Sequence, residues 1–140
     1  MKHRVALALI AVLGAVSAGA AAAQDDRPSQ IACDTKKLGG RDLADCLRVA
    51  AEHADRDVAA ALEAAVKSID GRQGLLSSQK GRWRRSLNEA QAQWVNWRDV
   101  ECQDVAPFEA GMAAKGADPR LACVIDADAA RVASLKARYP

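Results

Sequence analysis

The sequence has few aromatic residues and few groups that could carry chemistry. Among its 140 residues only five are aromatic, while half are hydrophobic, and alanine supplies much of that half. Such a composition does not favour a sheet-rich core, whereas alanine favours thin, closely packed helices. The chain also lacks a phosphate-binding loop, a dinucleotide fingerprint and a hydrolase nucleophile elbow. We therefore expect one all-α domain, and composition alone assigns it no activity.

The first 23 residues have the pattern of a secretory signal peptide. Basic residues at 2–4 precede an apolar run over residues 5–16, which is shorter than the roughly 20 residues that span a bilayer. Small residues surround Ala23, after which we expect cleavage. The alternative is an uncleaved anchor or a buried N-terminal helix. We expect a periplasmic or secreted mature chain with no transmembrane segment.

The mature chain has no excess of either charge. Removal of residues 1–23 leaves 18 basic and 18 acidic side chains. A general electrostatic attraction to nucleic acid is therefore not expected, and any anionic partner would have to be held by a local patch.

Four cysteines remain after cleavage. An even number in a small exported chain predicts two disulfides, for which three pairings are possible. Sequential pairing is favoured because each bond then closes a short loop beside a helix, and the crossed pairings stay open. No zinc-type spacing is present and His53 is the only histidine left, so we expect no metal and no other cofactor. The four are Cys33, Cys46, Cys102 and Cys123.

A polar lead-in is expected over residues 24–40, followed by a helical domain over residues 41–140. Apolar residues recurring at intervals of three and four predict a first helix over residues 42–69. Asp42 is its expected N-cap, and Gly71 is the expected residue just past its end.

The second helix is expected to begin at Ser77 or Ser78, or at the capping box that starts at Ser86. Pro107 is expected to end it. Asp118 is the expected N-cap of a third helix, whose apolar stripe is predicted from Leu121 to Tyr139. Three helices in this order predict that the chain folds into a small, disulfide-linked antiparallel bundle. The second helix is expected to face its neighbours with Trp83, Leu87, Ala90, Trp94, Trp97 and Glu101.

The strongest local pattern joins Gln91, Trp94, Arg98 and Cys102. Spacings of three, four and four place these side chains on one helix face. Arg98 can stack on Trp94, Gln91 can bond a neighbouring backbone group, and Cys102 can link this helix to the third. Packing is the favoured interpretation, and a ligand groove is the alternative.

This pattern, followed by a glycine-containing loop, a second cysteine and then Arg and Leu, resembles the lysozyme inhibitor LprI-like family. The resemblance extends roughly over residues 33–135. It implies a non-enzymatic exported protein that occludes the cleft of a lysozyme-type muramidase. Arg131 is expected to pair with Asp99 or Glu101. The family positions in this chain are Gln91, Trp94, Arg98, Asp99, Cys102, Cys123, Arg131 and Leu135.

A basic run over residues 80–85 supports a second hypothesis. It could hold an anionic envelope polymer, a lipid headgroup or an acidic protein, which would make the chain an envelope or stress module. Alternatively it is a solvated face balanced by the acidic side chains of the first helix. Phe108, in a loop over residues 107–119 anchored by two cysteines, is a further candidate contact. The candidate partner-binding residues are Arg82, Trp83, Arg84, Arg85 and Phe108.

Catalysis lacks the necessary groups. His53 and Asp57 lie one helical turn apart, but no nucleophile accompanies them. Asp99 and Glu101 are two residues apart and do not face each other on a helix. We therefore expect a protein that is not an enzyme.

Overall fold

The computed structural model describes residues 27–111 and 117–140, so the predicted signal peptide lies outside the described residues. These residues fold into helices and loops with no strand, which confirms the all-α class. No helix in the described part is both long and apolar enough to cross a membrane. The elements in chain order are α1 (Pro28–Ala32), α2 (Gly40–Gly71), α3 (Ser77–Val100), the π-helical turn η1 (Glu101–Val105), α4 (Ala106–Ala110) and α5 (Pro119–Arg138).

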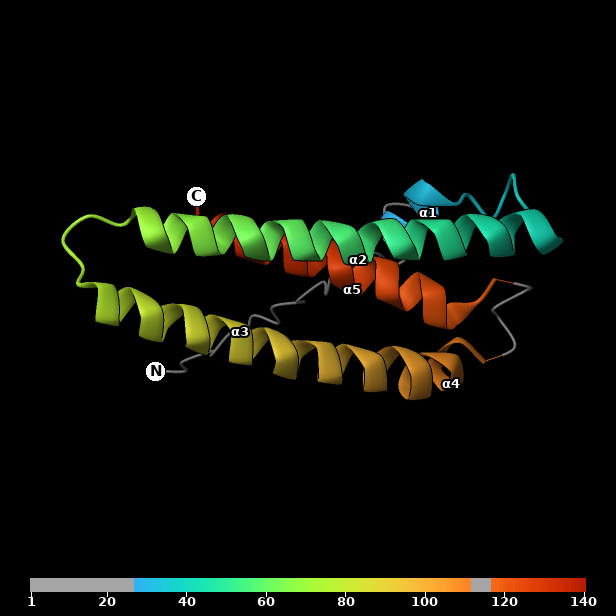
Figure 1. Cartoon of the computed structure of the whole chain (residues 1–140). Coiled ribbons are helices and arrows are strands. Elements are labelled where there is room, and N and C mark those ends of the chain that lie inside the picture. Colours follow the sequence, from blue (N-terminus) through green and yellow to red (C-terminus); the bar gives the residue numbers. More distant parts are fainter. Residues whose placement is uncertain (1–26, 112–116) are drawn as a thin grey trace, which may run out of the picture.

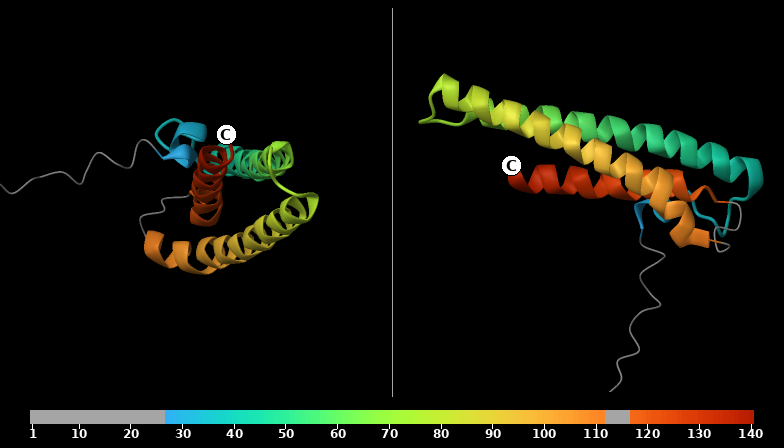
Figure 2. Two further views of the ribbon diagram at one scale, coloured as in Figure 1. Left: turned by 90° about the vertical axis from the view of Figure 1, so that its left-hand side faces the viewer. Right: turned by 90° about the horizontal axis from the view of Figure 1, so that it is seen from below.

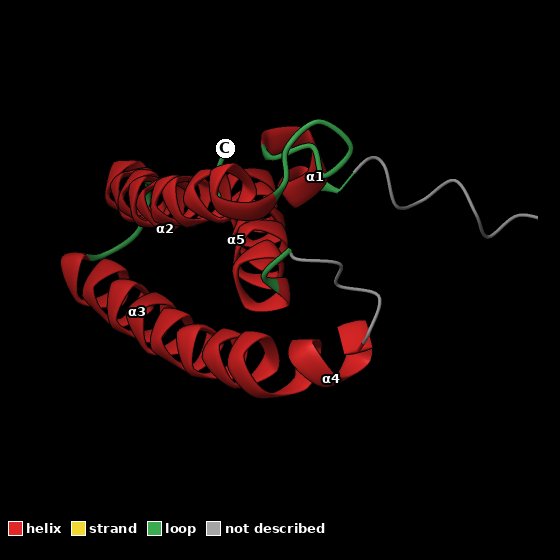
Figure 3. Ribbon diagram, turned by 90° about the vertical axis from the view of Figure 1, so that its right-hand side faces the viewer, coloured by secondary structure: helices red, strands yellow, loops and turns green. Residues whose placement is uncertain are grey.

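Helices α2 and α5 form a parallel pair, along which α3 runs in the opposite direction (Figure 1). Figure 2 shows the pair packed side by side, and Figure 3 shows α3 diverging from it. The predicted antiparallel bundle of about three long helices is therefore confirmed. Few α3 side chains are buried, whereas α2 buries apolar residues along its length and α5 buries Val124, Ile125, Asp128 and Leu135.

Two hydrophobic clusters form the core. The first, at the start of α2, contains Leu43, Leu47, Ala51, Val124 and Ile125 together with Cys33 and Cys102. The second, at the other end, contains Ala61, Ala65, Ile69, Leu87, Leu135 and Tyr139. The periodicities expected for the first and third helices supply most of these residues, and this part of the prediction is confirmed.

Two disulfides fasten the first of these ends, in the sequential pairing that was favoured. Cys33 is bonded to Cys46 across 13 residues, and Cys102 is bonded to Cys123 across 21 residues. The first bond holds the segment after α1 to α2, and the second holds η1 to α5. Each is worth about 3 kcal/mol on loop entropy alone, which is a large share of the stability of a small domain.

Of the three helix starts predicted from the sequence, two are confirmed and one is wrong. Asp118 caps α5 as predicted, because its Oδ1 accepts the Arg120 N–H at 2.9 Å. Helix α3 begins at Ser77, one of the predicted starts, and the Gln79 side chain accepts the Leu76 N–H at 2.9 Å. The prediction that Asp42 caps α2 is wrong, since α2 already begins at Gly40, where φ is +55°.

The prediction that Pro107 ends the second helix is also wrong. The helical path continues from α3 through η1 into α4 and ends at Gly111, where φ is +48°. Pro107 lies in the first turn of α4, directly after the π-helical turn, so the interruption of the regular α-helical hydrogen-bond ladder coincides with the residue that lacks an N–H. The polar lead-in likewise contains a structured turn, α1, which packs on α2 and α5.

Candidate functional site

A layer of polar and aromatic side chains separates the two hydrophobic clusters. On each of the three long helices these residues lie between the positions that contribute to one cluster and those that contribute to the other. The layer consists of Asp55 on α2, Gln91, Trp94, Arg98 and Asp99 on α3, and Asp128 and Arg131 on α5. Five of these seven residues are positions of the family pattern.

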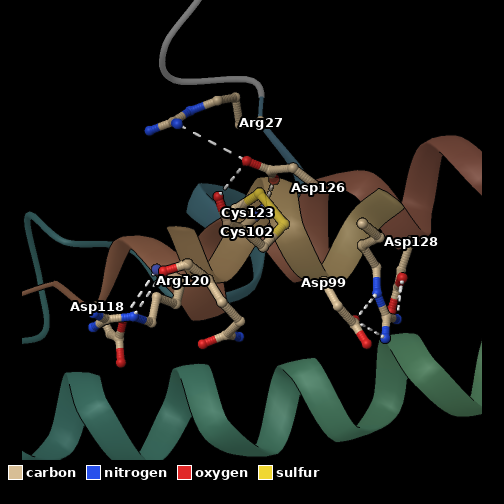
Figure 4. The surroundings of a disulfide bond; sticks show 11 residues. Arg27, Asp99, Cys102, Asp118, Arg120, Cys123, Asp126 and Asp128 are labelled. Carbon is tan, nitrogen blue, oxygen red and sulfur yellow. Dashed lines mark hydrogen bonds and ion pairs between the residues drawn. A yellow bond between two sulfur atoms is a disulfide. The ribbon is translucent and has the colours of Figure 1, made fainter. Parts of the chain in front are cut away.

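Arg98 is the centre of the layer. Its Nη1 donates to Asp55 Oδ1 at 2.6 Å and to Asp128 Oδ1 at 2.8 Å, and its Nη2 donates to Asp99 Oδ1 at 2.9 Å. Asp128 is completely buried, while Asp55 and Asp99 are more than half exposed. One guanidinium thus connects α3 to both α2 and α5 (Figure 4 labels Asp99 and Asp128).

Burial and pairing act in opposite directions on the charges of this layer. Burial raises the pKa of Asp128 above 3.8, although the hydrogen bond from Arg98 opposes the shift. Asp128 Oδ2 has no hydrogen-bond partner among the described residues, which adds to the cost of its charge. For Arg98, burial alone would lower the pKa, but the three carboxylates outweigh it and raise the pKa.

Trp94 lies between two guanidinium groups. The Arg98 Cζ is 5.5 Å and the Arg131 Cζ 5.4 Å from the indole ring, so the predicted stacking of Arg98 is confirmed. Arg131 Nε donates to Gln91 Oε1 at 2.9 Å. Arg131 therefore bonds an amide rather than Asp99 or Glu101, and Gln91 bonds a side chain rather than backbone, so both expectations are wrong. Burial and the nearby charge of Arg138 lower the pKa of Arg131.

The core-facing side of α3 differs from the predicted seam. Leu87, Gln91 and Cys102 are buried and Trp94 and Arg98 half-buried, whereas Trp97 is 54% exposed. Polar side chains thus occupy positions that the seam assigned to Ala90 and Trp97. They do so because their partners on α2 and α5 satisfy their hydrogen bonds.

Asp128 was not predicted to belong to the site. The sequence contained a signal for it, since Asp128 falls on the apolar stripe of α5 between Ile125 and Leu135. A carboxylate on a buried stripe indicates a buried cation on a neighbouring helix.

Asp126 anchors α1 beside the second disulfide. Its Oδ1 accepts the Ser29 N–H at 2.7 Å and its Oδ2 accepts the Ser29 hydroxyl at 3.0 Å. Arg27 lies 3.9 Å from the same carboxylate (Figure 4). The disulfide-linked end of the molecule is therefore held by covalent and charged contacts.

The basic run lies at the opposite end. Arg82 and Arg85 are exposed, but Arg84 pairs with Asp70 at 3.1 Å. Trp83 packs against the second cluster and donates to Tyr139 Oη at 3.4 Å. Phe108 lies on α4, at the far end of the continuous helix, so the structure does not bring it together with the basic run (Figure 1).

These features define a small, exclusively helical protein in its described part, cross-linked by two disulfides and a buried charge network. The described residues contain no group of three or more His, Cys, Asp or Glu side chains that could hold a metal ion. A family model described as "Lysozyme inhibitor LprI" matches residues 33–135. The chain belongs to the LprI lysozyme inhibitor family. No curated protein and no solved structure was found to match it.

Proposed function

We propose that the chain is exported, loses its signal peptide after Ala23 and acts outside the cytoplasm as a non-enzymatic inhibitor of a lysozyme-type muramidase. Membership of the LprI family over residues 33–135 carries this proposal. Both disulfides lie within the matched region, which fits a protein that folds in an oxidising compartment.

Inhibition by steric occlusion fits the chemistry of the family positions. Gln91, Trp94, Arg98 and Arg131 contact one another or neighbouring helices, and Cys102 and Cys123 are bonded together. The pattern is thus occupied in holding the helices and supplies no free nucleophile or general base. A rigid scaffold loses little conformational entropy on binding, which favours tight association.

A turbidity assay tests the proposal. Cell-wall suspensions are lysed by lysozymes of the c, g and i types, with and without about a tenfold molar excess of the mature oxidised protein. We expect slower lysis for at least one type, together with a saturable Kd in a direct binding measurement. Unchanged lysis with all three types would overturn the proposal. A reduced and alkylated sample serves as the control, since loss of both disulfides should remove inhibition.

A second candidate function is supported by the charge at the far end of the bundle. Residues 60–90 and 131–140 contain nine basic and three acidic side chains, and the segments converge at the end where α2 stops and α3 begins (Figure 1). This end would suit an anionic envelope polymer. Retention on immobilised dextran sulfate that is lost in an Arg82→Glu, Arg85→Glu variant would support it, and equal retention of the two proteins would refute it.

A further inference from the structure

An exposed apolar stripe runs along the end of the continuous helix formed by α3, η1 and α4. Trp97, Val100, Val105 and Phe108 are 54%, 58%, 36% and 87% exposed. Their spacings are three, five and three residues, and the interval of five spans η1. Because a π-helical turn contains more residues than an α-helical turn, this interval keeps Val105 in line with Val100. The stripe accounts for half of the exposed large hydrophobic residues in the described chain.

The stripe is carried by a rigid support. The Cys102–Cys123 disulfide bonds η1 to α5, and Arg120 Nε donates to the Gln103 carbonyl oxygen at 3.4 Å. Figure 4 shows this disulfide beside Asp126, which in turn holds α1. An apolar surface held in this way pays little entropy on docking.

A cavity of about 540 Å³ opens beside Trp97, between the end of α3 and the start of α5. Its lining combines small apolar residues with Arg27 and with the carboxylates of Glu101, Glu109 and Asp126, of which Asp126 already pairs with Arg27 and Ser29 while Glu101 and Glu109 do not. The cavity is wide enough for a long side chain and carries acidic groups at its wall. A lysine or arginine therefore suits it better than an anionic or purely apolar group.

The carboxylates on both sides of the stripe are unpaired within the described residues. Glu101, Asp104 and Glu109 form no ion pair there. More broadly, residues 27–59 and 91–130 contain 13 acidic and nine basic side chains, the reverse of the other end. The zero net charge of the mature chain therefore conceals two ends of opposite sign, and the stripe lies on the acidic one.

We propose that the stripe of Trp97, Val100, Val105 and Phe108 is the surface that docks on the muramidase, with a basic side chain of that enzyme entering the cavity beside Glu101. Charge complementarity selects a basic surface on that enzyme, because the carboxylates that flank the stripe attract a cationic group and repel an acidic protein. The inference rests on the proposed function and adds to it the contact surface. It also assigns the basic run no part in that contact.

Two variants and two matched controls test the surface, using the lysozyme type that the wild-type protein inhibits. Phe108→Ala removes an exposed apolar side chain from the stripe, and Leu76→Ala removes one that is 69% exposed at the other end. Glu109→Lys reverses an exposed charge beside the stripe, and Glu89→Lys reverses one further back on α3. All four changes are at the surface, so circular dichroism and the unfolding midpoint should stay the same.

We expect Phe108→Ala to raise Kd about tenfold, mainly through faster dissociation. Glu109→Lys should slow association several-fold at low salt, and the difference should shrink as salt is added. Both controls should bind within about twofold of wild type. If the wild-type protein inhibits and both stripe variants bind like the controls, the docking surface is refuted and the proposed function stands. If the wild-type protein binds no lysozyme, the proposed function fails and this inference with it.

Discussion

Substitutions of Arg98 and of Asp128 should have very different effects on the free energy of unfolding, although the two residues form one buried charge pair. Arg98→Ala leaves the Asp128 carboxylate, which is 0% exposed, without its only cationic partner in the described chain. Stranding a buried charge in this way costs about 3–5 kcal/mol. Loss of the contacts to Asp55 and Asp99 adds at most about 1 kcal/mol each, because both carboxylates are more than half exposed.

Asp128→Asn should be far milder. The amide keeps an acceptor for Arg98, and the guanidinium retains its bonds to Asp55 and Asp99. The raised pKa of Asp128 points the same way, since it means that the fold favours the uncharged carboxyl. We expect a cost of about 1 kcal/mol or less.

Urea unfolding followed by circular dichroism measures the free energy of unfolding of both variants. In a thermal melt of a domain of this size, the loss of stability in Arg98→Ala should lower Tm by on the order of 10 °C. Arg98→Met combined with Asp128→Leu removes both charges and should lie closer to wild type than Arg98→Ala does. The reasoning is refuted if Arg98→Ala costs less than about 1 kcal/mol, or if Asp128→Asn costs as much as Arg98→Ala.

Three further predictions concern the scaffold. Non-reducing peptide mapping should find Cys102 linked to Cys123 and no free thiol, and replacing this pair by serine should cost about 3 kcal/mol in thermal unfolding. Trp94→Ala should cost about 2 kcal/mol because the half-buried ring also loses two guanidinium contacts, while Trp97→Ala should stay within about 0.5 kcal/mol. The pKa of Asp128 is raised in the fold, so the native state holds this proton more tightly than the unfolded chain does. Protonation of Asp128 therefore adds stability as the pH falls through its folded pKa towards 3.8. Urea midpoints at about pH 7 and pH 4 should therefore show wild type gaining on Asp128→Asn at the lower pH, and an unchanged difference would contradict the shift.

The parts of the fold that the sequence predicted depend on local patterns. Helices α2 and α5 follow from apolar residues at intervals of three and four, and Asp118 before a proline marks the start of α5. The disulfide pairing followed from loop length, because each bond joins cysteines that are close in sequence. In each case the residues that form the pattern and the structure that they predict lie close together in the sequence.

The parts that the sequence did not predict depend on partners distant in the chain. Gln91 and Arg98 occupy the core-facing side of α3 only because Arg131 and Asp128 stand opposite them. A periodicity scored on apolar residues alone instead selects Trp97, which is exposed. Similarly, Pro107 predicts a helix end when the sequence is considered alone, but the π-helical turn before it places the proline in the first turn of α4.

The polar layer gives the family positions of this chain a structural role that the apolar clusters do not share. The apolar clusters on either side consist largely of alanine, leucine, isoleucine and valine, whose non-directional contacts specify a register less sharply than a charged hydrogen bond does. Arg98 cannot shift freely, because a movement of one turn along α5 would leave Asp128 buried without its cation. Two apolar clusters thus supply stability, while the buried ion pair between them and the Cys102–Cys123 disulfide both hold α3 and η1 in one register on α5. The same register places the exposed stripe at the acidic end.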